Sequence, residues 1–126
     1  MKPERDEMTE AEDLKPRTKR YALTVIRLYK VLPKTQEEVR ILGRQFLRSG
    51  TSVAANYREA SRARSRAEFI SKIEICAQEA DETQLWMELL KEGCDCTHDL
   101  IDTVWKESDE LISIFVAMSK NTKNNS

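Results

Sequence analysis

The chain has 126 residues, of which 40% are hydrophobic and 34% are charged, and its net charge is −1. This length allows one domain with a core that needs no disulfide or structural metal, and the odd count of 3 Cys does not indicate a disulfide framework. No apolar run approaches the roughly 18 residues of a membrane span, and the charged N-terminus does not resemble an export signal, so we expect a cytoplasmic protein with no membrane partner.

The chain begins with a charged segment. Residues 1–14 carry acidic side chains with little apolar periodicity, which predicts a disordered acidic arm. A first helix is expected over about 15–32, with Pro16 in its first turn, where a missing N–H has no effect, and with Pro33 ending it. Its inward stripe has the spacing of one helical face and comprises Tyr21, Val25, Leu28 and Leu32.

A second helix is expected over about 35–62. Thr35 and Glu38 have the spacing of a capping box, in which each residue satisfies a backbone N–H at the helix start. Gly50 lies inside this helix and predicts a bend or a close contact with a neighbour, because the stripe keeps its phase through it. The inward stripe comprises Val39, Leu42, Phe46, Ser49, Val53, Asn56 and Ala60.

A third helix is expected over about 65–92. Ser65 and Glu68 form a second capping-box pattern, and Gly93 is placed to end the helix in the left-handed conformation. The inward stripe comprises Phe69, Ile73, Cys76, Ala80, Thr83, Met87 and Leu90.

A fourth helix is expected over about 97–119, followed by a flexible tail at 120–126. Its stripe comprises Leu100, Val104, Leu111, Ile114 or Phe115, and Met118. The connections between the four predicted helices are short, so consecutive helices must run antiparallel. The sequence therefore predicts an all-α, up-down-up-down four-helix bundle as a single domain over residues 15–119.

Charge is divided unevenly between the two halves of the chain. Residues 15–72 hold 15 basic and 4 acidic side chains, a balance of +11, whereas residues 73–119 hold 2 basic and 12 acidic ones, a balance of −10. Residues 1–14 contribute −4 and residues 120–126 contribute +2, which recovers the net charge of −1. This asymmetry concerns partners rather than fold, and it predicts one basic and one acidic flank.

Two stretches carry a family resemblance. They are Arg48 to Gly93, RSGTSVAANYREASRARSRAEFISKIEICAQEADETQLWMELLKEG, and Leu111 to Lys120, LISIFVAMSK. The chain resembles a bacterial family of four-helix bundles that includes proteins encoded by intervening sequences in large-subunit ribosomal RNA genes. Distant relatives are the accessory variability proteins of diversity-generating retroelements. The resemblance implies a homopentameric ring and a nucleic-acid-binding or reverse-transcriptase-accessory role, and it carries no catalytic motif.

A row of arginines on the second helix is the main candidate for a functional site. Five arginines of this helix fall within an arc of roughly 80° at about 100° per residue, namely Arg40, Arg44, Arg48, Arg58 and Arg62. The following turn adds Arg64 and Arg66, and Lys72 lies one turn into the third helix. Guanidinium groups grip phosphates bidentately, so the row suits a nucleic-acid backbone, RNA or DNA. Because only Tyr57 adds an aromatic ring beside the row, structured RNA is expected rather than a single strand. The predicted binding residues are Arg40, Arg44, Arg48, Arg58, Arg62, Arg64, Arg66 and Lys72.

The same arginines have two alternative interpretations. The acidic third and fourth helices offer a complementary surface on a neighbouring copy, which fits a ring that serves as a structural or protein-interaction hub without nucleic acid. The arginines also fit a plain solvated face, because exposed charges contribute little to stability.

Polar residues on the inward face of the second helix indicate a buried hydrogen-bond network. Ser49, Ser52 and Asn56 need partners if they are buried, and Gln78 or Glu79 on the third helix is expected to supply them. We interpret this group as a lock on the register of the two helices, because no histidine lies near to activate a serine.

No pattern indicates catalysis, a metal or a cofactor. Cys94, Cys96 and His98 offer at most three zinc ligands, and we expect them in a surface loop with reduced thiols. The inward Glu-x-x-His pairs of di-metal bundles are absent from the sequence. The sequence therefore predicts a protein without enzymatic activity and without a cofactor.

Overall fold

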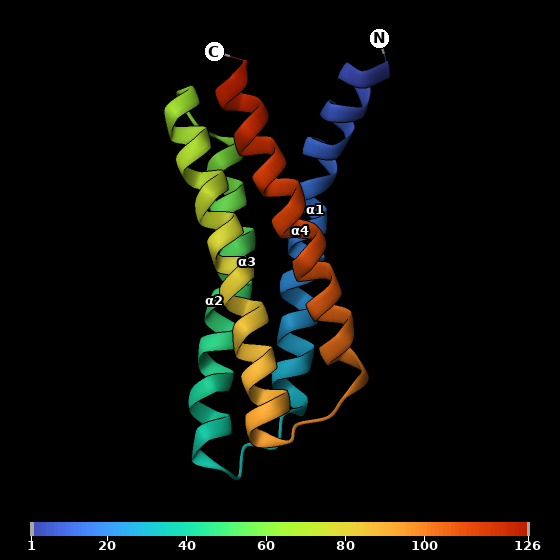
Figure 1. The fold of residues 1–126 in the computed structure, drawn as a ribbon, viewed down its shortest axis with the longest axis vertical. Helices are drawn as coiled ribbons and strands as arrows, with labels where there is room; N and C mark the ends of the chain where they lie inside the picture. The colour runs from blue at the N-terminus through green and yellow to red at the C-terminus, as the bar shows by residue number, and fades with distance from the viewer. Residues whose placement is uncertain (1, 126) are drawn as a thin grey trace.

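Four α-helices make up the chain: α1 (Lys2–Val31), α2 (Glu37–Ser61), α3 (Arg66–Cys94) and α4 (Asp99–Asn124). The computed structural model describes the backbone of residues 2–125 and the side chains of residues 14–125, and this part contains no β-strand. Consecutive helices run antiparallel, so the α2–α3 connection lies at one end of the bundle and the other two connections lie at the opposite end (Figure 1). The predicted all-α up-down fold is confirmed.

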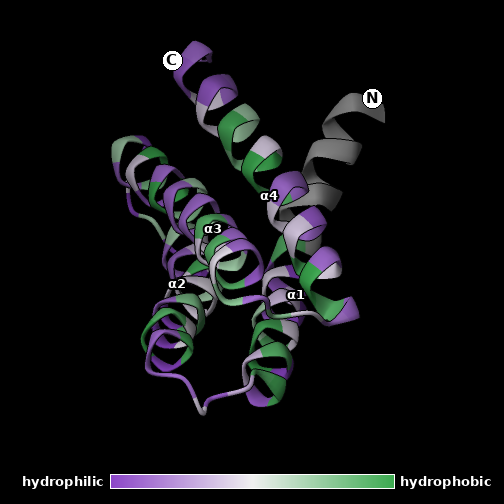
Figure 2. Cartoon of the chain, turned by 60° about the horizontal axis from the view of Figure 1, so that its bottom comes forward, coloured by the Kyte–Doolittle hydropathy of each residue, from purple (hydrophilic) through white to green (hydrophobic). Residues whose placement is uncertain are grey.

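The predicted inward stripes form the core. Hydrophobic and hydrophilic residues alternate along the coloured parts of the four helices (Figure 2), and most of the predicted inward positions are buried. Phe46 and Phe115 are the largest side chains at 0% exposure. Complete burial of one such side chain stabilises the fold by about 1.5–3 kcal/mol. Leu42, Phe69 and Met118 were also predicted to point inward, but they are partly buried at the edge of the core.

The helices differ in how closely they pack. The α2–α3 contact is the most extensive, whereas α1 and α4 meet at few points, and we call this contact the α1–α4 seam. Arg17 of α1 crosses the seam, with its Nε 2.7 Å from Glu107 Oε2 and its Nη2 2.9 Å from Glu110 Oε1. The hydrogen bond to Glu107, more than any other contact, raises the pKa of the Arg17 guanidinium. Charge therefore helps to close the seam.

The first helix starts earlier than predicted. It begins at Lys2, so residues 2–13 of the predicted arm are helical, and Pro16 lies inside the helix rather than in its first turn. The segment contains good helix formers, and a helix that is already nucleated gains one hydrogen bond with each added residue. Residue 1 lies outside the described residues.

The last helix also runs further than predicted. Helix α4 continues to Asn124, so most of the predicted flexible tail is helical. Thr122 Oγ1 donates to the Met118 carbonyl oxygen at 2.7 Å, and Lys123 Nζ lies 2.6 Å from Glu74 Oε2 on α3. These contacts hold the final turn against its neighbour. Residue 126 lies outside the described residues.

The helix ends agree only in part with the predicted caps. The Ser65 hydroxyl accepts from the Glu68 N–H at 3.0 Å as expected, but the Glu68 carboxylate accepts from the Arg64 N–H at 2.8 Å rather than from Ser65. Helix α3 ends at Cys94, and Asp95, not Gly93, takes the left-handed conformation with φ 57°. An aspartate tolerates this conformation better than most residues.

The predicted capping box at the start of α2 is wrong. The N-cap is Gln36, and no side chain caps it. Arg40 instead reaches back and donates from Nη1 to the Lys34 carbonyl oxygen at 2.9 Å, which ties the helix to the α1–α2 connection. Thr35 lies within the turn formed with Lys34, so Gln36 rather than Thr35 occupies the cap position.

Candidate nucleic-acid interface

The eight basic residues predicted to bind nucleic acid separate into two groups. Three of them, Arg40, Arg48 and Lys72, form ion pairs with carboxylates of the same chain. The other five are exposed, and none forms an ion pair with any residue whose side chain the structure describes. These five are Arg44, Arg58, Arg62, Arg64 and Arg66.

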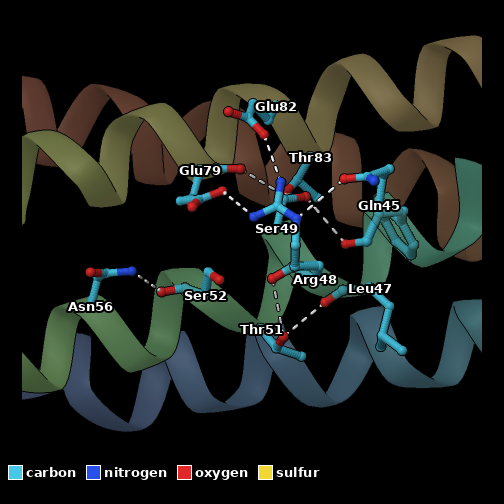
Figure 3. A network of polar contacts seen from close by, with 11 residues as sticks. Gln45, Leu47, Arg48, Ser49, Thr51, Ser52, Asn56, Glu79, Glu82 and Thr83 are labelled. Carbon is cyan, nitrogen blue, oxygen red and sulfur yellow. Dashed lines mark hydrogen bonds and ion pairs between the residues drawn. The ribbon is translucent and has the colours of Figure 1, made fainter.

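Arg48 joins α2 to α3. Its guanidinium lies between two acidic side chains of α3, with Nη2 2.9 Å from Glu82 Oε1 and Nη1 3.4 Å from Glu79 Oε1 (Figure 3). Its Nε donates to Gln45 Oε1 at 3.2 Å. These contacts engage the nitrogen atoms that would grip a phosphate, and they join α2 to α3.

Lys72 and Arg40 are also occupied. Lys72 Nζ lies 2.6 Å from Glu59 Oε1, and this hydrogen bond raises the pKa of the Lys72 ammonium. Arg40 donates to backbone carbonyl oxygens of the α1–α2 connection and lies 3.4 Å from Glu37. Lys72 therefore joins α2 to α3, and Arg40 closes the opposite end of the bundle.

Four of these five arginines gather where α2 ends and α3 begins. We call Arg58, Arg62, Arg64 and Arg66 the basic end. Hydrogen bonds hold the connection that carries Arg62 and Arg64: the Arg62 N–H donates to the Glu59 carbonyl oxygen at 3.1 Å, and the Ser65 and Glu68 contacts described above fix the start of α3. Arg58 is in the last turn of α2, and Arg66 is the first residue of α3. The fifth arginine, Arg44, lies nearly four turns earlier on α2 and does not belong to this cluster.

A groove opens beside the basic end. It has a volume of about 600 Å³, and α1, α2, the α2–α3 connection and α3 all contribute to it. Tyr57 is 3% exposed, and its ring lies 6.3 Å from that of Phe115, so it is part of the core beneath the groove. The lining residues are Lys15, Tyr57, Ala60, Ser61, Arg62, Ala63, Ser65 and Phe69.

The arginine pattern did not predict two of the residues that line this groove. Phe69 fits the inward stripe of the third helix, so the sequence places it in the core, yet it is half-buried and lines the groove. Lys15 is distant from the arginines in sequence, and only the packing of α1 against α2 brings it to this end. The early position of Phe69, in the first turn of α3, was the one sequence signal that it lies near the arginines.

A known protein family matches this chain. The family model of the 23S rRNA-intervening sequence protein matches residues 13–123, which is nearly the whole chain. The chain belongs to the 23S rRNA-intervening sequence protein family. This confirms the family resemblance carried by the second, third and fourth helices.

A solved structure agrees with this family membership. The chain is similar to a protein of unknown function from the S23 ribosomal protein family of Bacteroides thetaiotaomicron, with 38% identity and a TM-score of 0.75. The match covers 84% of this chain and 97% of the other. No curated protein matches the chain. Among the described residues of this family member, no helix is both long and apolar enough to cross a membrane.

Of the three polar residues predicted to lock α2 against α3, Ser49 contacts α3, and it does so through a partner other than the expected ones. The Ser49 hydroxyl lies 2.7 Å from Thr83 Oγ1, and both side chains are buried (Figure 3). The expected partners, Gln78 and Glu79, do not fill this role with their side chains. Asn56 is half-buried and donates to the Ser52 carbonyl oxygen at 2.9 Å within its own helix.

The cysteines and the histidine contribute to the packing and the helix ends of the bundle. Burial raises the pKa of the Cys76 thiol to about 12, and burial also raises the pKa of Cys96, which is 3% exposed rather than in a surface position. His98 Nδ1 accepts from the Leu100 N–H at 3.0 Å and caps α4. Within the described part of the chain, no three His, Cys, Asp or Glu side chains lie together as metal ligands would.

Proposed function

We propose that this member of the family is a non-catalytic protein that binds structured RNA through the basic end. The observation that carries the proposal is the gathering of four exposed arginines, Arg58, Arg62, Arg64 and Arg66, without ion-pair partners among the residues with described side chains. Residues 58–72 hold 5 basic and 2 acidic side chains, and one of the two acids is paired with Lys72.

The chemistry of the basic end suits phosphate groups. Arginine keeps its charge at all physiological pH values and presents a planar fork of donors to two phosphate oxygens at once. Four such groups, two on the hydrogen-bonded connection and two on the adjoining helix ends, can contact successive phosphates with little loss of backbone entropy on binding. The association of the family with an insertion in ribosomal RNA makes RNA the first probe to test, ahead of DNA.

Existing contacts of three basic residues favour the basic end over the middle of α2 as the proposed site. Arg48 and Lys72 already pair with carboxylates of α3 and α2, and Arg40 holds the α1–α2 connection. We therefore propose that the basic end contacts RNA and that these three residues stabilise the protein's own fold.

The test compares two triple variants of equal charge. Labelled hairpin RNA is titrated at about 50 mM and about 200 mM salt against the natural protein, against Arg58→Ala/Arg62→Ala/Arg66→Ala, and against Arg20→Ala/Arg27→Ala/Arg44→Ala. Phosphate contacts give a steep loss of affinity with salt, and each lost contact lowers the log–log slope by about 1. We expect the first triple variant to lose most of the slope and the second to keep it. Equal behaviour of the two variants would show that affinity follows total charge rather than this site.

A second candidate function is a self-assembling interaction hub. Leu85 and Leu89 lie one turn apart on α3 and are 45% and 40% exposed, and such neighbouring apolar side chains favour a covered surface. The resemblance adds a pentameric ring and an accessory role beside a reverse transcriptase as further hypotheses. Sedimentation of Leu85→Ser/Leu89→Ser tests the hub: a fall in mass without loss of helix content supports it, and an unchanged mass counts against this face.

A further inference from the structure

The groove beside the basic end combines an apolar wall with cations and hydroxyl groups. Phe69 of α3 contributes a half-buried aromatic ring, and the buried Tyr57 lies beneath it. Lys15 of α1 and Arg62 at the end of α2 bring positive charge to the same groove. An apolar wall with a few convergent polar groups is the usual composition of a small-molecule or base-binding pocket.

One serine hydroxyl in the groove can still accept a hydrogen bond, and another can still donate one. Ser61 Oγ donates its proton to the Arg58 carbonyl oxygen at 2.7 Å, so its lone pairs remain to accept a hydrogen bond. Ser65 Oγ accepts from the Glu68 N–H at 3.0 Å, so its own proton remains to be donated. One donor and one acceptor at the same wall match the edge of a nucleobase or a ribose 2′-hydroxyl.

The size and the surroundings of the groove limit which kinds of ligand it can bind. A volume of about 600 Å³ exceeds what an amino-acid side chain or an inorganic phosphate would fill and lies within the range of pockets for nucleotide-sized molecules. The other arginines of the basic end do not line the groove; these are Arg58, Arg64 and Arg66. They would not contact a free mononucleotide in the groove, but they can bind the phosphates on either side of a nucleotide within a strand.

We infer that this groove accommodates one unpaired nucleotide of an RNA hairpin, with its base against Phe69 and its phosphate between Lys15 and Arg62. The inference rests on the proposed function and names the RNA more closely: a helix with a bulged or looped-out nucleotide rather than a perfect duplex. A paired base is stacked inside its helix and cannot enter a groove, whereas an unpaired base can turn outward and stack on an aromatic ring.

The test uses two hairpins of identical sequence except for a single bulged 2-aminopurine in one of them. We expect the bulged hairpin to bind the natural protein about tenfold more tightly, since stacking of one base on an aromatic ring has about this effect. We also expect its 2-aminopurine fluorescence to change on binding. Phe69→Leu keeps an apolar side chain in the groove and should remove the preference, while the affinity for the perfect hairpin stays the same. Lys15→Ala, on the exposed surface of α1, should lower the preference without affecting the fold.

The outcomes separate this inference from the proposed function. Equal, salt-sensitive binding of both hairpins overturns the nucleotide pocket and leaves the basic end as an RNA site. No binding of either hairpin at low salt overturns both. Saturable binding of free AMP with no preference for the bulged hairpin also overturns the inference, because it would assign the groove to a free nucleotide. Circular dichroism of each variant confirms that the bundle is intact.

Discussion

The hydroxyl of Ser49 on α2 lies 2.7 Å from the hydroxyl of Thr83 on α3, and both side chains are 0% exposed. Thr83 Oγ1 also lies 2.7 Å from the Glu79 carbonyl oxygen, whereas Ser49 Oγ lies 3.3 Å from the Phe46 carbonyl oxygen. The shorter backbone contact of Thr83 favours Ser49 as the donor between the two hydroxyls. We expect Thr83→Val to destabilise the protein by about 1–3 kcal/mol, because it leaves the buried Ser49 with only a long contact to its own helix.

A double-mutant cycle measures this pair. Ser49→Ala alone and Thr83→Val alone should each lower the urea midpoint, and the double variant should lose less stability than the sum of the two. Strict additivity of the two free-energy changes would show that the hydroxyls do not stabilise one another.

Gly50 provides a second prediction, because it lies in close contact with α1. A Cβ atom at this position would lie 2.7 Å from both methyl carbons of Val25. Gly50→Ala should therefore destabilise the bundle by about 1–3 kcal/mol, although alanine favours a helix by about 1 kcal/mol over glycine. The matched control is Gly93→Ala: nothing lies within 4 Å of its added Cβ, so this change should stabilise the protein or leave it unchanged. Urea unfolding of both variants decides the matter, and a stabilising Gly50→Ala would contradict the close contact.

Alkaline pH should lower the free energy of unfolding, because the buried Tyr21 hydroxyl and Cys76 thiol resist deprotonation in the folded state. Burial raises the pKa of Tyr21 to about 12 and that of Cys76 to about 12, from ordinary values of 10.0 and 9.0. The unfolded chain loses these protons first as pH rises, so the stability that their neutral forms provide is complete below pH 9 and decreases between about pH 9 and pH 12. Unfolding measured from pH 8 to pH 11 should show this decrease.

Single variants identify the source of the alkaline effect. Cys76→Ala should flatten the decrease between pH 9 and pH 10, and Tyr21→Phe should flatten it above pH 10. Tyr21→Phe also removes the hydrogen bond of 2.5 Å to Ser108, which should lower stability by about 1 kcal/mol at neutral pH. Unchanged pH profiles in both variants would assign the effect to other groups.

Arg48 tests the division of the arginines into internal and external groups. Its ion pairs with Glu79 and Glu82 are partly exposed, and its side chain is 49% exposed, so Arg48→Ala should lower stability by less than about 1 kcal/mol. It should leave RNA affinity nearly unchanged, whereas Arg62→Ala should lower it without lowering stability. The reverse pattern in a paired binding and urea experiment would move the RNA site to the middle of α2.

The sequence predicted the bundle well because burial repeats along each helix. Tyr21, Val25 and Leu28 share one face of α1, and this periodicity alone determines which face turns inward. The helix ends were less predictable, since Gln36 rather than Thr35 precedes α2, and Arg40 replaces a side-chain cap with a contact that depends on the path of the preceding turn.

The candidate site was only partly visible in the sequence. The arginines lie on one arc of α2, but pairing depends on α3. Arg48 pairs with Glu79 and Glu82, whereas Arg58 and Arg62 form no ion pair with any residue whose side chain the structure describes. Helical periodicity locates a residue on its own helix and not the partner opposite it. The groove with Lys15 and Phe69 therefore required the packed structure.

The α1–α4 seam gives the bundle one side that is easier to open than the others. Helix α1 is attached chiefly through α2, and its link to α4 depends on Arg17 with Glu107 and Glu110 and on the Tyr21–Ser108 hydrogen bond. Added salt screens the charges but not the apolar contacts. At high ionic strength, α1 is therefore the element whose amide hydrogens should exchange first, while α2, α3 and α4 remain folded together as a unit.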